Sequence, residues 1–205
     1  LILSAWRWLD ENRGAAKYLR QITALGVDSK FVERHLGPLA QMLGVPAGRL
    51  QFERALGLNS KPMTVRLRFD GPTLELPRGI THAELRVDEL ETLASGVKRV
   101  LIVENEVTFL SLPVPERGAV VWGRGYEVGV TGSVSWMSDA DVVYWGDVDT
   151  HGFAIINALR AHISHTRSVL MDRETLLAHE ERWGSEPQPT AVQLAYLTAD
   201  ETELY

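Results

Sequence analysis

The feature that most constrains this chain is an apolar strand pattern that runs into a pair of aspartates. Residues 141–146 are largely apolar and end in glycine, and Asp147 and Asp149 follow at positions i and i+2. A second apolar pattern, over residues 151–163, is typical of a helix. Turns that join a strand to a helix at the carboxyl edge of a sheet are where α/β folds place ligands and metal ions. This stretch therefore predicts an α/β fold with a functional site at the turn.

A partner for this turn lies upstream, where a predicted strand over residues 98–104 ends in Glu104. The carboxyl ends of parallel strands lie at one edge of a sheet, so Glu104 is expected to meet Asp147 and Asp149 there. Carboxylates that lie close together raise one another's pKa unless a cation lies between them. Oxygen ligands suit Mg²⁺ or Mn²⁺, which can activate a water and stabilise a departing oxygen in phosphoryl transfer. We therefore predict a divalent-metal site for phosphodiester chemistry.

Each of these acids also has a purely structural interpretation. An Asp-x-Asp pair at a strand end can be a simple turn, and Asp149 or Thr150 can cap the following helix. The combination of an acid after one strand with Asp-x-Asp after a later strand of the same α/β pattern favours the metal site. Gly146 and Gly152 are expected to let the backbone approach closely on either side of the two aspartates.

Strands and helices alternate beyond residue 94, which predicts a mostly parallel sheet with helices on both faces. The predicted strands cover residues 98–104, 118–123, 141–146 and 168–171, and the predicted helices cover residues 106–112, 151–163 and 173–182.

The first part of the chain predicts a smaller domain of helices with a small sheet, an α+β arrangement that could bind DNA or a partner. A helical pattern covers residues 1–25. Alternating polar and apolar residues over 63–69 predict a strand with one solvent-facing side. We place the boundary near residue 94, so the predicted domains are 1–94 and 95–205.

Composition narrows the classes of protein that this chain can be. Its 205 residues carry a net charge of −6, so contact with nucleic acid must come from local basic patches, metal ions or another subunit. The chain has no cysteine, which excludes disulfides and thiolate metal sites and is typical of a cytoplasmic protein. No apolar run approaches the roughly 18 residues of a membrane span, so no membrane role is expected. The chain begins without Met and ends within a helical pattern, and we expect it to be part of a longer protein.

The acidic segments resemble the Toprim fold of topoisomerases, primases and related nucleases. The string from Gly146 to Gly152, Gly-Asp-Val-Asp-Thr-His-Gly, is most similar to the version in the A subunit of type VI topoisomerases and the meiotic recombination transesterases. Residues 123–126, Gly-Arg-Gly-Tyr, resemble the glycine-lysine-glycine-tyrosine stretch after the second Toprim strand, with arginine in place of lysine.

A closer resemblance, to the JetD nuclease family of Wadjet systems, covers most of the chain. This family, also called MksG or EptD, serves bacterial SMC-type complexes that restrict plasmids. The resemblance implies a Mg²⁺- or Mn²⁺-dependent endonuclease that acts as a homodimer on double-stranded plasmid DNA presented by an SMC–kleisin motor. The strings that carry it lie at residues 26–35, 61–70, 102–110, 144–153, 170–173 and 176–179.

The resemblance also implies roles for individual residues. Glu104 matches the Toprim glutamate, a metal ligand or general acid/base, and Asp147 and Asp149 match its metal-binding pair. The type VI topoisomerases need a nucleophilic tyrosine on a separate domain, and this chain has no evident counterpart, since Tyr126 lies inside the Toprim unit. Water is therefore the favoured nucleophile, and strand transesterification through a tyrosine is the alternative.

Six further residues are weaker candidates, each with a structural alternative. Glu106 and Asp172 are candidates for additional metal ligands, although Glu106 can equally begin a solvated helix and Asp172 can cap one. The other candidates are DNA contacts, for which a solvated face or a helix start is the alternative: Arg66, Arg68, Arg124 and His151.

Two other functions remain open at this stage. The string Asp147-Val148-Asp149-Thr150 also suggests a phosphatase of the haloacid-dehalogenase type, in which the first aspartate attacks phosphorus. In that pattern a threonine stands where this chain has His151. A non-catalytic scaffold for SMC subunits is the second alternative, and the intact set of acids argues against it.

Overall fold

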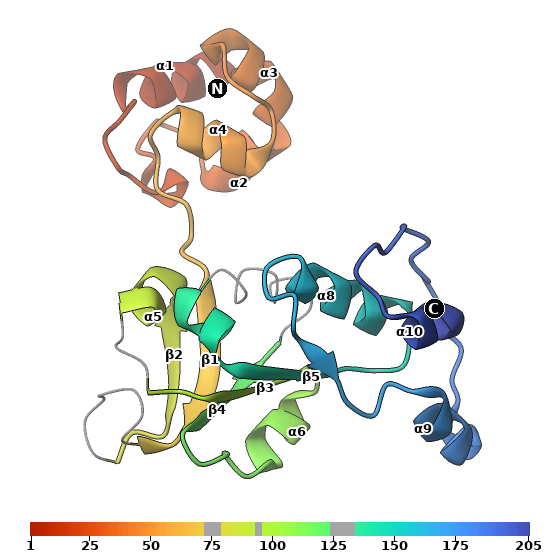
Figure 1. Ribbon diagram of the computed structural model, residues 1–205. Coiled ribbons are helices and arrows are strands. Elements are labelled where there is room, and N and C mark those ends of the chain that lie inside the picture. Colours follow the sequence, from red (N-terminus) through yellow and green to blue (C-terminus); the bar gives the residue numbers. More distant parts are fainter. Residues whose placement is uncertain (72–78, 93–95, 124–133) are drawn as a thin grey trace. The chain divides into compact units, whose positions relative to one another are not determined.

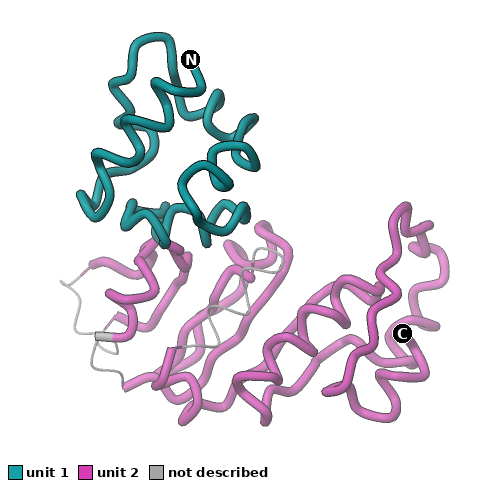
Figure 2. Tube along the Cα trace, turned by 90° about the horizontal axis from the view of Figure 1, so that it is seen from above, with its two compact units in different colours: residues 1–62 teal, residues 63–205 magenta. Residues whose placement is uncertain are grey.

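A computed structural model describes most of the chain (Figure 1). The described ranges are residues 1–71, 79–92, 96–123 and 134–205. The chain divides into two compact units, Leu1–Pro62 and Met63–Tyr205 (Figure 2). Within the described ranges, no helix has both the length and the apolar character that a membrane span needs.

Unit 1 is helical and has its own apolar core. Leu9, Val32, Leu39 and Phe52 are fully buried in this core. Helices this short are not stable by themselves, so their packing against one another holds them. The elements of the unit are α1 (Ile2–Glu11), a 3-10 turn (Leu19–Gln21), α2 (Ser29–Arg34), α3 (Leu36–Leu43) and α4 (Arg49–Ala55).

The helix predicted over residues 1–25 is wrong beyond Glu11, where α1 ends. Gly14 adopts a φ of 71°, and its N–H donates to the carbonyl of Leu56 at 2.8 Å. A Cβ on Gly57 would lie only 2.7 Å from the Cα of Gly14. Two glycine backbones thus pack directly together, and this contact turns the chain out of the helical path.

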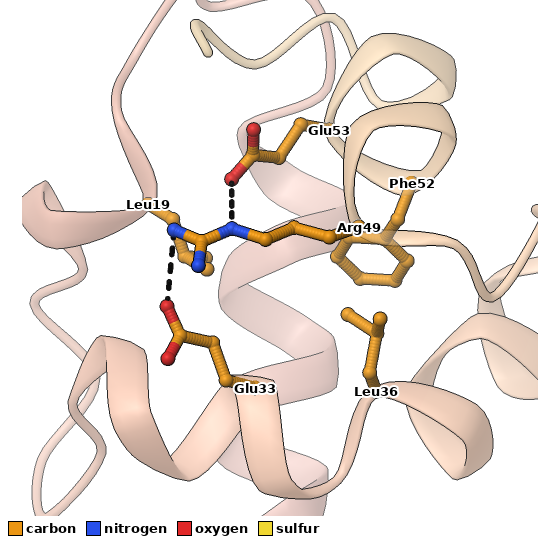
Figure 3. A pocket seen from close by; sticks show the side chains of 6 residues that line it. All are labelled: Leu19, Glu33, Leu36, Arg49, Phe52 and Glu53. Atoms are coloured by element: carbon orange, nitrogen blue, oxygen red, sulfur yellow. Dashed lines mark ion pairs between the residues drawn. The ribbon is translucent and has the colours of Figure 1, made fainter. Parts of the chain in front are cut away.

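Arg49 ties α4 to α2 across a small pocket in unit 1 (Figure 3). Its Nη2 lies 3.1 Å from Oε1 of Glu33, and its Nε lies 3.6 Å from Oε1 of Glu53. The side chain of Glu53 is only 6% exposed, so the guanidinium offsets the cost of burying that carboxylate. The rest of the pocket, whose volume is about 130 Å³, is lined by Leu19, Leu36 and Phe52.

Unit 2 is built on a six-stranded sheet with the strand order β2-β1-β4-β3-β5-β6. β3 pairs in parallel with β4 on one side and with β5 on the other, and β6 continues the parallel part beyond β5. β1 pairs antiparallel with both β4 and β2. The predicted mostly parallel α/β sheet is confirmed. The strands are β1 (Thr64–Phe69), β2 (His82–Arg86), β3 (Arg99–Val103), β4 (Gly118–Trp122), β5 (Asp141–Trp145) and β6 (Arg167–Ser168).

Helices cover both faces of this sheet, with α6 and α8 on opposite sides (Figure 1). Successive residues of β3 point to opposite faces. Val100 and Ile102 belong to the larger core, which also contains Phe153 of α8, and Val103 belongs to a second core with Phe109 of α6. The helices of unit 2 are α5 (Val87–Thr92), α6 (Glu106–Ser111), α8 (Thr150–Arg160), α9 (Arg173–Ala178) and α10 (Ala199–Leu204).

The division after Pro62 differs from the boundary predicted near residue 94. Leu67 of β1 pairs with Val121 of β4, and the hairpin partner β2 pairs with β1. The strand residues Val65 and Leu67 lie in the main core of unit 2. The alternating pattern of β1 identified a strand with one buried face, but such a pattern does not say which sheet the strand joins.

A buried ion pair fastens α10 to α8. Nη1 and Nη2 of Arg160 donate to the two carboxylate oxygens of Glu201 at 2.5 and 3.0 Å, and these side chains are only 8% and 5% exposed. The hydroxyl of Ser168 and the N–H of Thr198 donate to the same carboxylate. Burial by itself raises the pKa of Glu201, but these hydrogen bonds outweigh it and lower the pKa from 4.5 to about 2.

The turn between β5 and α8 depends on Gly152. A Cβ at this position would lie 2.1 Å from the carbonyl oxygen of Asp147 and 3.3 Å from Cε of Met171. The first turn of α8 therefore packs directly on the backbone of Asp147. The close approach predicted at Gly152 is confirmed.

Replacing Glu201 with Gln is expected to lower the free energy of unfolding by about 3 kcal/mol, because Arg160 would become a buried cation without a carboxylate. Urea denaturation measures the difference in the free energy of unfolding between the variant and the unchanged chain. The folded-state pKa of Glu201 lies below its unfolded-state pKa, so the stabilisation by the ion pair is present above pH 4.5 and is lost as the pH falls through about 2. Glu203→Gln, at an exposed position of the same helix, is the control. Equal losses in the two variants would contradict the role of the pair.

Gly152→Ala is expected to lower the free energy of unfolding by about 2 kcal/mol or more, because its Cβ would overlap a backbone oxygen that cannot move freely. Gly184→Ala is the control, since Gly184 is exposed and a Cβ there meets nothing within 4 Å. The control is expected to keep or slightly raise stability. If urea denaturation gave the same midpoint for Gly152→Ala as for the unchanged chain, the packing argument would fail.

Candidate functional site

Glu104 lies directly beyond the end of β3, beside the end of β5. The parallel register pairs Val103 with Trp145, and the N–H of Glu104 donates to the carbonyl of Trp145 at 3.2 Å. Its own carbonyl accepts the indole N–H of Trp122 at 2.9 Å. Three neighbouring strands, β4, β3 and β5, therefore fix the backbone of Glu104 at the carboxyl edge of the sheet.

Asp147 and Asp149 follow β5 at the same edge, and the predicted meeting with Glu104 is confirmed for Asp147. The N–H of Asp147 lies 3.5 Å from Oε2 of Glu104 and points toward it. Asp149 is the N-cap of α8, where its Oδ1 accepts the N–H of Gly152 at 2.7 Å. Its capping role, one of the two interpretations open from the sequence, is thus what this side chain does in the structure.

The electrostatics of the site couple the acids to one another. Burial raises the pKa of Glu104, and the negative charge of Asp147 raises it further. Burial likewise raises the pKa of Asp147, and the charge of Asp149 adds to the shift. The charge of Asp147 thus makes Glu104 harder to ionise, the charge of Asp149 does the same to Asp147, and a proton or a cation at this edge relieves the repulsion.

These residues fit a divalent cation in ligand chemistry and in charge. Carboxylate oxygens are the ligands that Mg²⁺ and Mn²⁺ prefer. Across the described ranges, no three His, Asp or Glu side chains stand in an arrangement that could hold a metal ion as they are. Asp149 is turned toward α8, where its Oδ1 accepts the N–H of Gly152. Coordination by all three acids therefore requires the side chain of Asp149 to rotate.

Arg66 and Glu106 bind each other beside the site. Nη1 of Arg66 donates to Oε1 of Glu106 at 2.5 Å, and Nε of Arg66 donates to Nε2 of His82 at 3.0 Å. The guanidinium also stacks on the rings of Phe109 and Trp122, with distances to the ring centroids of 5.4 and 5.2 Å. Arg66, which was predicted to contact DNA, and Glu106, which was predicted to bind a metal ion, thus form an ion pair that joins β1 to the start of α6.

Arg68 is engaged at the other end of α6. Its Nη1 donates to the carbonyls of Phe109 and Leu112 at 2.9 and 2.7 Å. These carbonyls belong to the last turn of the helix, which leaves such groups without intrahelical partners. Neither the solvated face nor the phosphate contact expected for Arg68 describes this arrangement, in which the side chain caps a helix.

The remaining weaker candidates have separate positions. Asp172 caps α9, and the hydrogen bond from the N–H of Thr175 holds its pKa below the usual range, as expected for the capping alternative. Nε2 of His151 lies 2.9 Å from the carbonyl oxygen of Gln188 and 3.5 Å from Glu186. Arg124 and Tyr126 lie outside the described residues.

The sequence analysis missed two residues that shape the site. The hydroxyl of Tyr144 donates to Oε2 of Glu104 at 3.2 Å. The carboxylate of Glu186 accepts the hydroxyl of Thr150 at 2.6 Å and its N–H at 3.2 Å, directly after Asp149. A polar hydroxyl at an inward position of a buried strand could have pointed to Tyr144. No local pattern marks Glu186, which lies 36 residues beyond its partner.

Comparisons with known proteins place the chain in a family. The family described as Wadjet protein JetD, C-terminal, matches residues 57–205. A second family, described as uncharacterized protein conserved in bacteria N-term (DUF3322), matches residues 1–44. No curated protein matches the chain. Because the first match covers most of the sequence, the chain belongs to the Wadjet protein JetD family.

Proposed function

We propose that this chain is the metal-dependent DNA endonuclease subunit of a Wadjet complex and hydrolyses phosphodiester bonds of plasmid DNA. The observation that carries the proposal is the set of acids at the adjacent ends of β3 and β5. Glu104 and Asp147 share that edge through a direct contact between a carboxylate and a backbone N–H, and Asp149 follows in the same turn. Burial, and after it the charge of a neighbouring aspartate, raises the pKa values of Glu104 and Asp147, and a cation at this edge would favour their ionised forms.

Glu104, Asp147 and Asp149 would hold Mg²⁺ or Mn²⁺ in this proposal, as in a Toprim site. When bound, such an ion supplies the charge that activates a water and stabilises the departing oxygen. The chain's own part is to position oxygen ligands on a rigid sheet edge. Glu104 is also suited to exchange a proton, because burial and Asp147 keep its pKa above the ordinary carboxyl range.

Water is the nucleophile that we propose, in preference to a tyrosine. Among the described residues, Tyr144 is the tyrosine that contacts the site, and it is fully buried. Burial and the charge of Glu104 raise its pKa far above the usual value, which disfavours the phenolate that an attack on phosphorus requires. This supports hydrolysis over the transesterification of type VI topoisomerases.

Partner subunits would present the DNA. The chain has a net charge of −6, and two of the basic side chains predicted to contact DNA, Arg66 and Arg68, are bound to α6. The charge balance therefore supports a nuclease that depends on an SMC–kleisin motor, and on pairing into a homodimer, to hold its substrate. Family membership supports a place beside other Wadjet subunits.

In the assembled complex with Mg²⁺ or Mn²⁺, the unchanged chain is expected to cut circular plasmid. Glu104→Gln and Asp147→Asn are each expected to reduce the cleavage rate by about 100-fold or more, because each removes a charged ligand or proton acceptor. Gel electrophoresis of plasmid over time measures the rate. Glu116→Gln, an exposed acid away from the site, is the control and should cut normally.

Metal-dependent cutting that survives both site substitutions would contradict the assignment of the site. A complex that assembles but cuts no plasmid with either metal would support the scaffold alternative. Protein that becomes covalently attached to DNA during the reaction would support the transesterase alternative instead.

Glu104→Gln is expected to raise the free energy of unfolding of the metal-free chain at neutral pH. The folded-state pKa of Glu104 is raised, so its ionised form destabilises the fold, and neutral Gln removes that cost. The gain should disappear as the pH falls through the raised pKa, where Glu104 is protonated in the unchanged chain. Urea denaturation across this pH range measures the difference.

The matched variant is Asp149→Ala, which is expected to lower the free energy of unfolding by about 1 kcal/mol because α8 loses its N-cap. A loss of stability in Glu104→Gln at neutral pH would show that Glu104 serves the fold, and would count against a site built around its charge.

A further inference from the structure

The side chain of Tyr144 lies in the main core of unit 2, and its hydroxyl is hydrogen-bonded to the candidate site. The side chain is 0% exposed and packs in the same core as Ile102 and Phe153. Its hydroxyl donates to Oε2 of Glu104 at 3.2 Å. Burying a hydroxyl costs free energy unless it finds a partner, and a phenylalanine would fill the same space without that cost. The hydroxyl therefore points to a role in holding Glu104.

The absence of a side chain at Gly146 leaves the space that the ring of Tyr144 occupies. A Cβ on Gly146 would lie 2.3 Å from the hydroxyl oxygen and 2.6 Å from Cζ of Tyr144. Any side chain at position 146 would therefore require the ring of Tyr144 to shift from the position in which its hydroxyl contacts Glu104. The sequence predicted a close approach of backbone at this glycine, and the group that lies close in the structure is instead the side chain of Tyr144, two residues earlier.

The next residue completes the contact on the same atom. The N–H of Asp147 also points to Oε2 of Glu104, at 3.5 Å. Within the described ranges, Oε1 of Glu104 accepts no hydrogen bond. One oxygen of the carboxylate is thus held by β5 and the turn beyond it, and the other remains for a ligand from outside.

We propose that Tyr144 is a positioning residue that fixes the Glu104 carboxylate through Oε2 and leaves Oε1 for the divalent cation, with Gly146 required for this arrangement. The inference rests on the proposed metal site. Groups that hydrogen-bond a metal ligand orient it, and their loss weakens metal binding although they never touch the ion. The functional motif then begins at Tyr144, three residues before the first aspartate.

The test is the affinity of the metal-free chain for Mn²⁺, measured by the decrease of the free-ion signal in electron paramagnetic resonance. Tyr144→Phe removes one oxygen and keeps the volume of the ring, so the core is retained. It is expected to raise the Kd for Mn²⁺ by about 10- to 100-fold. Tyr18→Phe is the control, because Tyr18 is an exposed tyrosine of unit 1 and should leave the Kd unchanged.

A double-mutant cycle with Glu104→Gln separates positioning from a general effect on the fold. If Tyr144 acts through Glu104, Tyr144→Phe weakens Mn²⁺ binding in the unchanged chain and causes no further loss in the Glu104→Gln background. Near-ultraviolet circular dichroism of each variant reports whether the core remains packed.

The outcomes distinguish this inference from the proposed function. An unchanged chain that binds no Mn²⁺ would overturn both. Mn²⁺ binding that is equally strong in Tyr144→Phe would overturn the positioning role and leave the metal site standing. An equal loss in both backgrounds, or a loss of the packed core in Tyr144→Phe, would show a purely structural tyrosine and would also overturn the proposal.

Discussion

The parallel pairing of β3 with β5 is the interaction on which the candidate site depends. The register Val103↔Trp145 sets the end of one strand beside the end of the other, so Glu104 and Asp147 arrive at the same place although 43 residues separate them. Val100, Ile102 and Val142 bury this pair of strands in the main core. The free energy gained from that burial is what can offset the cost of holding carboxylates together at the strand ends.

The stability of the fold and the proposed chemistry favour opposite charge states of the carboxyl groups at this edge of the sheet. Stability favours neutral groups there, as the raised pKa values of Glu104 and Asp147 indicate. A metal-dependent reaction favours two or more ionised oxygens in one place. Local destabilisation of this kind is common at functional sites, where the rest of the structure maintains an arrangement that would not persist by itself.

Several contacts on the far side of the turn keep α8 in place, and so fix the turn that carries the two aspartates. Gly152 lets the helix pack on the backbone of Asp147, and Glu186 holds the first residue of the helix by two hydrogen bonds. At the other end of α8, Arg160 is joined to Glu201 of the C-terminal helix. Segments that carry none of the proposed chemistry thus determine where the site residues stand.

The sequence by itself determined the α/β class, the strand ends that carry Glu104 and Asp147, and the need for glycine on both sides of the aspartates. These features follow from local periodicity and from the rule that parallel strands end at one edge. It also identified strings that resemble the JetD family, and a family match over residues 57–205 confirms that membership.

Only the tertiary structure determined which groups the polar side chains bind. It joined the β1–β2 hairpin to the sheet of unit 2, turned Arg66 and Arg68 toward α6, and set Tyr144 against Glu104. The physical reason is that periodicity records which face of an element is buried. Hydrogen bonds and ion pairs between residues far apart in the chain depend on a register that no local pattern contains.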